Sequence, residues 1–502
     1  MVLLQSSVDW QSLSVEVVDQ LAWTAICHWQ DHSSIDPIRN GLNYAELTRS
    51  FLWDKASRAI RQHRNPEKFA FERSLIQPLQ GKFRQNRNPI AELLKQPFRP
   101  TYDRIRAIRQ TSVSNRQNLP ILFVPRPCPR LKQGLETLMR SKQILLRGSY
   151  LQSSYFLEIN KLGQQPPLTS DEAAFAFQLY EGITEGLKAF NIELISEDAP
   201  RLQTQIIQQL AYVRVAEIEM RMTRPDAILL YADNHHPVQE YALIAQRDGI
   251  PSVMLQHGLD CERYYLDEAY ASDLAVWGTH RRDRYQQDSS YQPRIVITGN
   301  PEYDRLRYPE KLAPEGNYWL WVTRPHSPEK CYAPSRYADE GIEILEALMI
   351  ALSKFPDARL VIKPHPADYV ERYQTYIEQH SLSDRVEVST TNVQTLIAKA
   401  SVVISEDSTA GLEAMFFGKP VIHAHFAASA PVLSFVRSSA AFPGYSPEML
   451  CDSLNQVQQL TAMQQSDLFE AQRDFLQSHA GDCDGQAAQR VMSLILETIH
   501  KA

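Results

Sequence analysis

The chain has 502 residues, of which 43% are hydrophobic and 22% charged, with a net charge of −7. These values are ordinary for a soluble globular protein and exclude a disordered chain, a collagen and a coiled-coil rod. No stretch approaches the roughly 18 uncharged apolar residues that a transmembrane helix needs. The N-terminus has no basic segment before its short apolar run, so we expect neither a secretory signal nor export from the cytoplasm.

The first part of the chain, residues 1–115, has a helical pattern. Apolar residues recur at helical spacing over 8–29 and again over 42–62, and several prolines follow. The block 51–150 carries 21 Lys and Arg against 6 Asp and Glu, a local net charge of +15. Such a block is typical of a surface for an anionic membrane, a polyanionic substrate or nucleic acid, or of a solvated helical face. Nucleic acid is not expected, because the interleaved aromatic residues that stack on single strands are missing.

Two regions of alternating strands and helices follow. The first has apolar strands at 120–125, 226–231, 252–257, 274–277 and 294–298, with long helices at 171–191 and 202–222. The second has strands at 318–322, 359–363, 386–388, 401–404 and 420–423, with closing helices at 464–478 and 486–500. Short strands separated by helices indicate parallel sheets. We therefore expect a helical basic extension (1–115), a first α/β domain (116–308) and a second (309–502).

The second region places polar residues after two strands that we expect to be adjacent. Lys363, His365 and Pro366 follow one strand, while Ser405, Ser408 and Thr409 follow another and precede a helix over 409–418. Ligands of parallel sheets bind at the carboxyl ends of strands, and a helix N-terminus favours phosphate. Each residue also has an ordinary structural explanation, since Ser and Thr commonly cap helices. Together they predict a site for the phosphates of a nucleotide.

Three further residues are candidates for the same site. Glu413 lies one helical turn beyond Thr409, where a carboxylate can bind both hydroxyls of a ribose. Arg324 and His326 follow the first strand of this region and are expected to reach the phosphates.

The first region supplies the candidates for acid–base chemistry. His257 ends a strand and precedes Gly258, which we expect to allow a sharp turn. An imidazole titrates near neutral pH and can act as general base on an acceptor hydroxyl. Asp260 and Asp233 are further catalytic candidates, as is His235, although Asp233 with Asn234 is also a typical helix cap.

The end of the first region predicts a hinge. Gly299 and Asn300 tolerate unusual backbone angles and precede Pro301, at the edge between the two domains. No DxD metal site is apparent and no cluster of metal-binding residues is visible, and the six cysteines form no CxxC pair. We therefore expect no metal, no cofactor and no disulfide framework.

The order of these motifs resembles the GT-B glycosyltransferases. The matching segments are His257-Gly258, Trp277-Gly278, TGNPEYD at 298–304, KPHP at 363–366 and SEDSTAGLEAMFFGKPVI at 405–422. Within that fold they are most similar to the group of CDP-glycerol glycerophosphotransferases, capsule polysaccharide transferases and bacterial sialyl- and Kdo-transferases. The resemblance covers roughly 225–425 and implies two Rossmann-like domains that face a cleft.

The resemblance also implies residue roles. A His-Pro motif and a paired Ser/Thr motif hold the donor phosphate in the sialyltransferase-like families, and His365-Pro366 and Ser408-Thr409 match them. The histidine of an HG motif acts near the acceptor in glycerophosphotransferases, and His257 matches it. Two motifs of these families are missing. The D/E-D-G motif that supplies the base of the sialyltransferases is not evident, and Leu259-Asp260 stands where the glycerophosphotransferases have Thr-Pro. UDP-GlcNAc 2-epimerases share the fold and the TGNP element, but their His-x-Glu-Ala-Gly loop is absent.

The sequence therefore predicts a metal-independent glycosyltransferase. It would move a sugar, or a glycerol-phosphate-like group, from a CMP-, CDP- or UDP-linked donor to a cell-surface polysaccharide or lipid-linked acceptor. The basic block would hold it at the inner face of the plasma membrane, where each Lys or Arg contributes about 1 kcal/mol near anionic lipid. The alternative is a catalytically inactive GT-B protein that binds polysaccharide or a partner protein.

Overall fold

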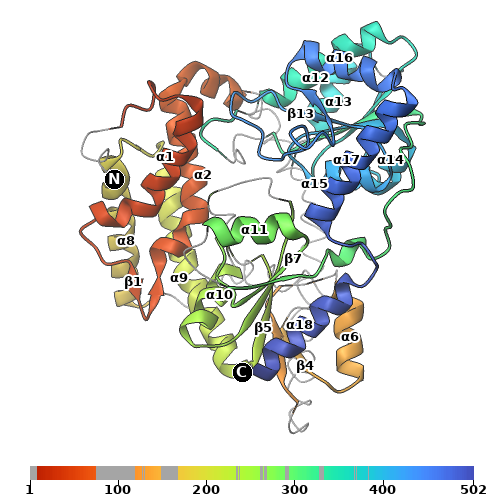
Figure 1. Cartoon of the computed structure of the whole chain (residues 1–502). Coiled ribbons are helices and arrows are strands. Elements are labelled where there is room, and N and C mark those ends of the chain that lie inside the picture. The colour runs from red at the N-terminus through yellow and green to blue at the C-terminus, as the bar shows by residue number, and fades with distance from the viewer. Residues whose placement is uncertain are drawn as a thin grey trace, which may run out of the picture.

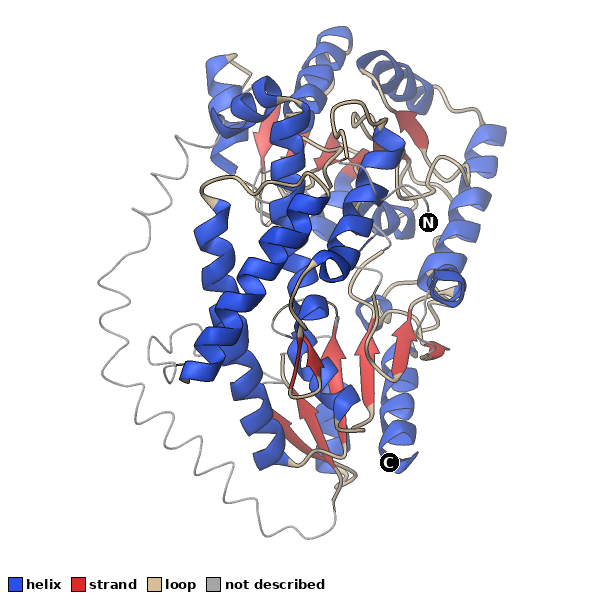
Figure 2. Ribbon diagram, turned by 90° about the vertical axis from the view of Figure 1, so that its left-hand side faces the viewer, coloured by secondary structure: helices blue, strands red, loops and turns tan. Residues whose placement is uncertain are grey.

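The computed structural model describes residues 8–74, 119–126, 128, 131–148, 168–232, 234, 236, 238–259, 264, 268–288, 293–326, 333–337, 339–366, 368, 370–382 and 384–501. Two parallel sheets of six strands each form the centres of two α/β domains (Figures 1 and 2). This is the arrangement of two Rossmann-like domains expected from the sequence. A helical N-terminal region is also present, as expected.

The first sheet has the strand order β4-β3-β5-β6-β7-β8, and every neighbouring pair is parallel. Its central strands are buried on both faces, which explains their continuous apolar sequences. The strands are β3 (Ile121–Val124), β4 (Leu145–Gly148), β5 (Ala227–Tyr231), β6 (Ser252–Leu255), β7 (Asp273–Val276) and β8 (Arg294–Ile297). Its covering helices include α6 (Lys132–Arg140), α10 (Val238–Arg247) and α11 (Thr279–Asp288).

The second sheet has the order β11-β10-β9-β12-β13-β14 and is also parallel throughout. Its strands are β9 (Tyr318–Val322), β10 (Leu360–Lys363), β11 (Val386–Val388), β12 (Ala400–Ser405), β13 (Val421–Ala424) and β14 (Phe442–Gly444). Its helices are α12 (Glu340–Lys354), α13 (Val370–Gln379), α14 (Val393–Lys399), α15 (Thr409–Phe416), α16 (Pro447–Gln458) and α17 (Ala462–Ala480).

Strand β9 is the point at which the order of the second sheet reverses. The chain proceeds from β9 to β10 and β11 on one side, then returns to place β12, β13 and β14 on the other. Strands β10 and β12 are therefore not adjacent, contrary to the expectation from the sequence, because β9 lies between them. Ligands of open parallel sheets bind at the carboxyl ends of strands where the order reverses.

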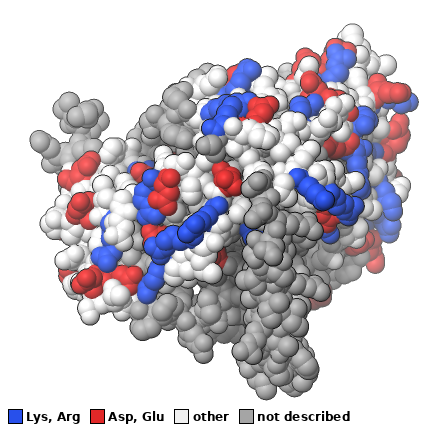
Figure 3. Space-filling model, turned by 90° about the horizontal axis from the view of Figure 1, so that it is seen from below, with Lys and Arg blue, Asp and Glu red and all other residues white. Residues whose placement is uncertain are grey.

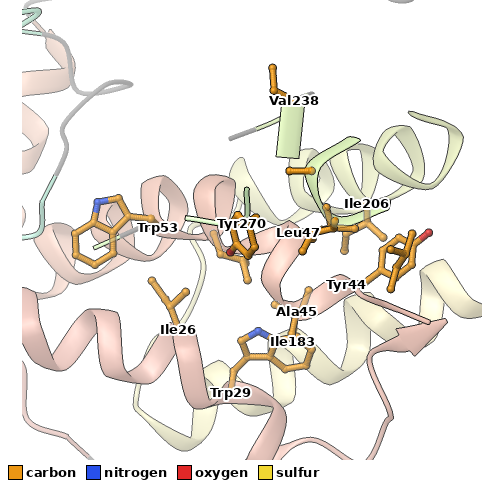
Figure 4. Close-up of a cluster of buried hydrophobic side chains, with 14 of the residues drawn as sticks. Ile26, Trp29, Tyr44, Ala45, Leu47, Trp53, Ile183, Ile206, Val238 and Tyr270 are labelled. Atoms are coloured by element: carbon orange, nitrogen blue, oxygen red, sulfur yellow. The ribbon is translucent and has the colours of Figure 1, made fainter. Parts of the chain in front are cut away.

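A helical layer lies beside the first domain (Figure 1). It is formed by α1 (Val15–His28), η1 (Trp29–His32), α2 (Tyr44–Arg64), α8 (Ser170–Ala189) and α9 (Asp198–Thr223), with the short hairpin β1 (Ile38–Arg39) and β2 (Leu42–Asn43). A capping box of Thr169 and Glu172 begins α8. Side chains of the layer and of the first domain form one buried cluster, to which Trp29, Tyr44 and Ile206 of the layer and Val238 and Tyr270 of the domain belong (Figure 4).

The last helix, α18 (Ala487–Lys501), returns to the first domain. It contacts β5, β6, β7 and α6, and its side chains Val491, Leu494 and Ile495 join the core of that domain. This position differs from the expected grouping of 309–502 as one domain, because the contacts that place α18 lie far away along the chain. The chain thus passes between the domains twice, after β8 and after α17.

The basic block is only partly described. Of its bases between 51 and 74, several form ion pairs inside the helical layer: Arg58 with Asp198, Arg61 with Glu72, and Arg73 with Glu197. Residues 75–118, 127, 129–130 and 149–150 of the block lie outside the described residues. No helix in the described part of the chain is long and apolar enough to cross a membrane.

Candidate functional site

The loop after β6 meets the start of α15, so the carboxyl ends of the two sheets face each other. The backbone N–H of Leu259 donates to the Thr409 hydroxyl at 3.5 Å. A methyl group added at Gly258 would lie 3.7 Å from the same hydroxyl oxygen. Leu259 and Trp277 of the first domain also join a hydrophobic cluster of the second. The predicted acceptor and donor motifs are therefore neighbours in space, although about 150 residues separate them.

His257 is exposed at this meeting point. Its ring packs edge-to-face with Tyr231 at the end of β5, with centroids 5.0 Å apart. The buried Gln256 side chain fixes the loop, because it donates to the Gly258 carbonyl at 2.8 Å and accepts from the Trp277 N–H at 2.8 Å. An exposed imidazole on a fixed backbone is suited to proton transfer with a bound hydroxyl group.

The chain bends at Gly258, as expected, without a left-handed backbone. Gly258 is absent from the residues with positive φ, and its turn is available to other residues. Gly299 does have this conformation, with φ of +79°, and Ala487 and Arg490 of α18 pack closely on it. Asn300 has an ordinary extended backbone instead and caps η4 (Pro301–Tyr303) through its side chain. Both hinge candidates therefore lie where the chain leaves the first domain.

A chain of hydrogen bonds holds the turn after β10. The backbone N–H of His365 donates to the Thr323 hydroxyl at 3.0 Å, and that hydroxyl donates to Asp368 at 3.2 Å. The buried Tyr373 hydroxyl donates to the same carboxylate at 2.6 Å. The side chain of Lys363 is half-buried, and those of His365 and Pro366 are exposed at the carboxyl end of the sheet.

The first residues of the loop after β12 are buried, and its last residue, next to α15, is half-buried. Ser405 is fully buried and donates to the Glu406 carbonyl at 3.0 Å, so it shapes the loop rather than lining its surface. Ser408 is half-buried and caps α15 by accepting from the Ala410 N–H at 3.3 Å. The cap does not occupy its hydroxyl proton, which remains able to donate to a ligand. The positive end of the α15 dipole lies at the same place.

Asp407 is the centre of a buried network that no local sequence motif predicts. Its carboxylate contacts His423 at 3.1 Å, His425 at 3.4 Å and Arg336 at 3.8 Å. The backbone N–H groups of Val432 and Leu433 donate to it at 3.3 and 3.0 Å. Burial alone would raise the pKa of Asp407, but the bonds from the two histidines and the charge of Arg336 hold it well below the usual range. We call Asp407, His423, His425 and Arg336 the Asp407 network.

Arg324 and His326 are buried beside this network rather than exposed to a ligand. His326 Nε2 lies 2.9 Å from the Glu406 carboxylate, which also accepts from the Arg324 N–H at 3.1 Å. Burial opposes the charge on Glu406, yet His326 and Arg324 lower its pKa below the ordinary value. These two candidates therefore support the loop after β12, and Arg324 comes within 4.0 Å of Asp407.

Glu413 faces η4, in the segment where the chain first leaves the first domain. The Tyr303 hydroxyl donates to it at 3.4 Å, so this carboxylate joins α15 to η4. Its predicted role toward a ribose stays a prediction. Asp233, His235 and Asp260 lie outside the described residues. In the part of the chain that the structure describes, no group of three or more His, Cys, Asp or Glu could hold a metal ion.

Residues 192–428 match the family model described as capsule polysaccharide biosynthesis protein. The resemblance is confirmed. The matched segment is just under half of the chain and contains both the loop after β6 and the Asp407 network. No curated protein matches the sequence.

Several solved structures are similar over most of their length. The UDP-GlcNAc 2-epimerase of Neisseria meningitidis bound to UDP-GlcNAc is 13% identical with a TM-score of 0.48, covering 76% of this chain and 100% of its own. The S. aureus MnaA–UDP structure is 13% identical with a TM-score of 0.46, covering 76% and 97%. The lipopolysaccharide outer core galactosyltransferase WaaB is 13% identical with a TM-score of 0.40, covering 75% and 100%. Because these TM-scores are below 0.5, we assign the fold from the two parallel sheets of this chain and not from these similarities.

Proposed function

We propose that the protein is a glycosyltransferase that uses a nucleotide-activated donor. It would transfer a sugar, or a glycerol-phosphate-like group, to a polysaccharide or lipid-linked acceptor. The observation that carries this proposal is the contact between the loop of His257 and the start of α15, because it joins a candidate base to a candidate phosphate site. The match of residues 192–428 to capsule polysaccharide biosynthesis proteins supports the class of acceptor.

The second domain would hold the donor phosphates. Ser408, Thr409 and the N-terminus of α15 supply hydroxyl groups and a partial positive charge, and Lys363 and His365 add a cation and an imidazole from β10. Thr323 and Asp368 fix the turn that carries His365. Donors already held in place can stabilise charge on a leaving phosphate without rearranging, and we propose that they act without a metal.

His257 would act on the acceptor. As the acceptor oxygen bonds to the transferred carbon, the bond from that carbon to the nucleotide phosphate breaks. The hydroxyl proton passes to the imidazole of His257, and the negative charge develops on the leaving phosphate at the start of α15. For transfer of a glycerol-phosphate-like group, the same oxygen would attack phosphorus instead of carbon.

Substitution of His257 tests this assignment. General-base catalysis typically contributes about 10²–10⁴-fold, so His257→Ala should lower kcat by that factor while leaving the nucleotide dissociation constant unchanged. His500→Ala, which removes an exposed histidine at the end of α18, is the matched control. Unchanged turnover in His257→Ala would remove this residue from the chemistry.

We propose a peripheral position at the inner face of the plasma membrane as the setting of the reaction. The face seen in Figure 3 gives it no direct support, because Lys and Arg are interspersed there with Asp and Glu. The proposal therefore depends on the bases of the block 51–150 that lie outside the described residues. Co-sedimentation with anionic vesicles at low salt should detect binding, and its absence would contradict the proposal.

A further inference from the structure

The helical layer contacts the loop that leads from β9 into α12. Asp19 of α1 accepts from the backbone N–H of Ser335 at 2.8 Å and from the Ser335 hydroxyl at 2.5 Å. Both residues are buried, at 8% and 7% exposure. A buried carboxylate is costly unless hydrogen bonds compensate it. The bond pair is therefore a specific connection between segments 316 residues apart.

Two further side chains, from α2 and from the helical segment that follows it, hold the same loop. Arg61 of α2 is fully buried, pairs with Glu72 at 3.2 Å and donates to the Arg336 carbonyl at 3.4 Å. Lys68 lies 3.1 Å from Asp339 and 4.8 Å from the ring centre of Tyr337. The backbone on both sides of Arg336 is thus fixed from outside its own domain.

The side chain of Arg336 points from this loop into the Asp407 network. Its guanidinium lies 3.3 Å from Nδ1 of His425 and 3.8 Å from the Asp407 carboxylate. It also lies 3.7 Å from Glu340 at the start of α12. Among the described residues of this network, Arg336 alone is held by the helical layer. The layer itself is packed into the core of the first domain.

We propose that the helical layer contributes to nucleotide binding. Asp19 and Arg61 are positioning residues, which hold Arg336 against Asp407 and His425. The site would then be built by three parts of the chain, and an isolated second domain would lack a correctly placed Arg336. This inference rests on the proposed function for its ligand, a nucleotide with one or two phosphates. Burial raises the pKa of Asp19, and the bonds from Ser335 and the charges of Arg336 and Arg64 oppose that rise.

Nucleotide titrations of the full chain test the positioning role. CMP, CDP and UDP are titrated into the wild type, Asp19→Ala and Asp19→Asn, with Asp31→Ala as a control that removes an exposed carboxylate of η1. We expect Asp19→Ala to weaken binding about tenfold, the equivalent of about 1.4 kcal/mol. Asp19→Asn keeps one acceptor oxygen and should lie between this variant and the wild type. Asp31→Ala should bind like the wild type.

A double-variant cycle separates positioning from a general loss of stability. In an Arg336→Ala background, Asp19→Ala should weaken binding no further, because the residue that it positions is gone. Equal effects in both backgrounds, or wild-type affinity in Asp19→Ala, would overturn the inference. Ser335→Ala removes only the hydroxyl donor and should act in the same direction more weakly, which covers the case in which Asp19→Ala does not fold.

Amide hydrogen exchange distinguishes failure of this inference from failure of the proposed function. If the wild type binds none of the three nucleotides and neither GDP nor ADP, the proposed function fails. Faster exchange over residues 333–337 in Asp19→Ala, relative to Asp31→Ala, would still support the positioning of the loop. Unchanged exchange there would contradict it, whatever the ligand.

Discussion

The Asp407 carboxylate contacts residues from several separate segments of the chain, which no single sequence motif contains. It contacts Arg336 in the loop after β9, His423 in β13 and His425 directly after that strand. Backbone groups of the loop at 432–433 also donate to it. A charge in so low a dielectric is stable only with such partners, and removing one member leaves the others uncompensated. The Asp407 network therefore fixes the buried side of the loop after β12, while Ser408 and Thr409 remain partly exposed.

The low pKa of Asp407 predicts how stability depends on pH. A carboxyl whose pKa is lowered in the folded state stabilises the protein above its unfolded pKa, and this contribution is lost as the pH falls through the folded pKa. Asp407→Asn should therefore be less stable than the wild type by about 3–5 kcal/mol near neutral pH. The difference should stay constant down to about pH 5 and shrink below about pH 4.

Unfolding midpoints measured from pH 7 to pH 3 check this prediction. Asp474→Asn removes an exposed carboxylate of α17 and serves as the control for a simple change of net charge. A difference between wild type and Asp407→Asn that stays the same down to pH 3 would show that the carboxylate is not held in its charged form by the network.

The residues that sequence analysis could identify are those next to the strand ends. Thr409, His257 and His365 were found because motif and strand lie together in the chain. The partners of Asp407 could not be found in this way, since β12, β13 and the loop after β9 meet only in the folded sheet. One available signal was the alternation His423-Ala424-His425 at the end of a predicted strand. Arg336 had no local signal, because its backbone is held by α1 and α2.

At the scale of elements, the central strands were predictable, whereas two of the four edge strands, β4 and β14, were missed. Strands such as β5 and β9 are continuous apolar runs buried on both faces, and they lie within a residue or two of their predicted bounds. Strands β4 (LLRG) and β14 (FPG) contain glycine or proline and lack the continuous apolar run that marks a strand in the sequence. The strand order of the second sheet could not be predicted either, because an alternation of strands and helices does not show where that order reverses.

The turn between β7 and α11 allows a sharp test of how the domains pack. A methyl group added at Gly278 would lie 2.2 Å from the backbone carbonyl oxygen of Ser478 in α17, so the backbone must shift. We expect Gly278→Ala to destabilise the protein by about 1–3 kcal/mol. For domains of this size, each kcal/mol lowers the unfolding midpoint by about 2–4 °C.

Gly258→Ala is the matched comparison for this variant. The added methyl group would meet only the Thr409 hydroxyl oxygen at an ordinary contact of 3.7 Å. Its midpoint should differ from that of the wild type by the equivalent of less than about 0.5 kcal/mol. Equal destabilisation by the two variants would mean that the contact of Gly278 with α17 does not hold the domains as described.

At the scale of the whole molecule, the candidate site lies where three parts of the chain converge. The first domain brings His257, the second domain brings α15 and the turn after β10, and the helical layer holds the loop of Arg336. Two crossings connect the domains, and Asp304 in the first crossing caps the helix that follows the second by accepting from the Ala487 and Ala488 N–H groups at 2.8 and 2.9 Å. Relative motion of the domains would therefore change the distance between the candidate base and the phosphate site.

Nucleotide binding at the start of α15 is the central claim, and a thermal-shift panel tests it most directly. CMP, CDP, UDP, GDP and ADP are compared with EDTA present, on the wild type, His365→Ala and Ser408→Ala. Ser446→Ala removes the equivalent cap of α16 and controls for the loss of a helix cap alone. A ligand at about 100 times its dissociation constant stabilises the folded state by about 2.7 kcal/mol, or about 5–10 °C.

We predict that one nucleotide gives a shift of this size in the wild type and in Ser446→Ala. The shift should fall markedly in His365→Ala and in Ser408→Ala. The absence of a shift with every nucleotide, or full shifts in both of these variants, would contradict the account.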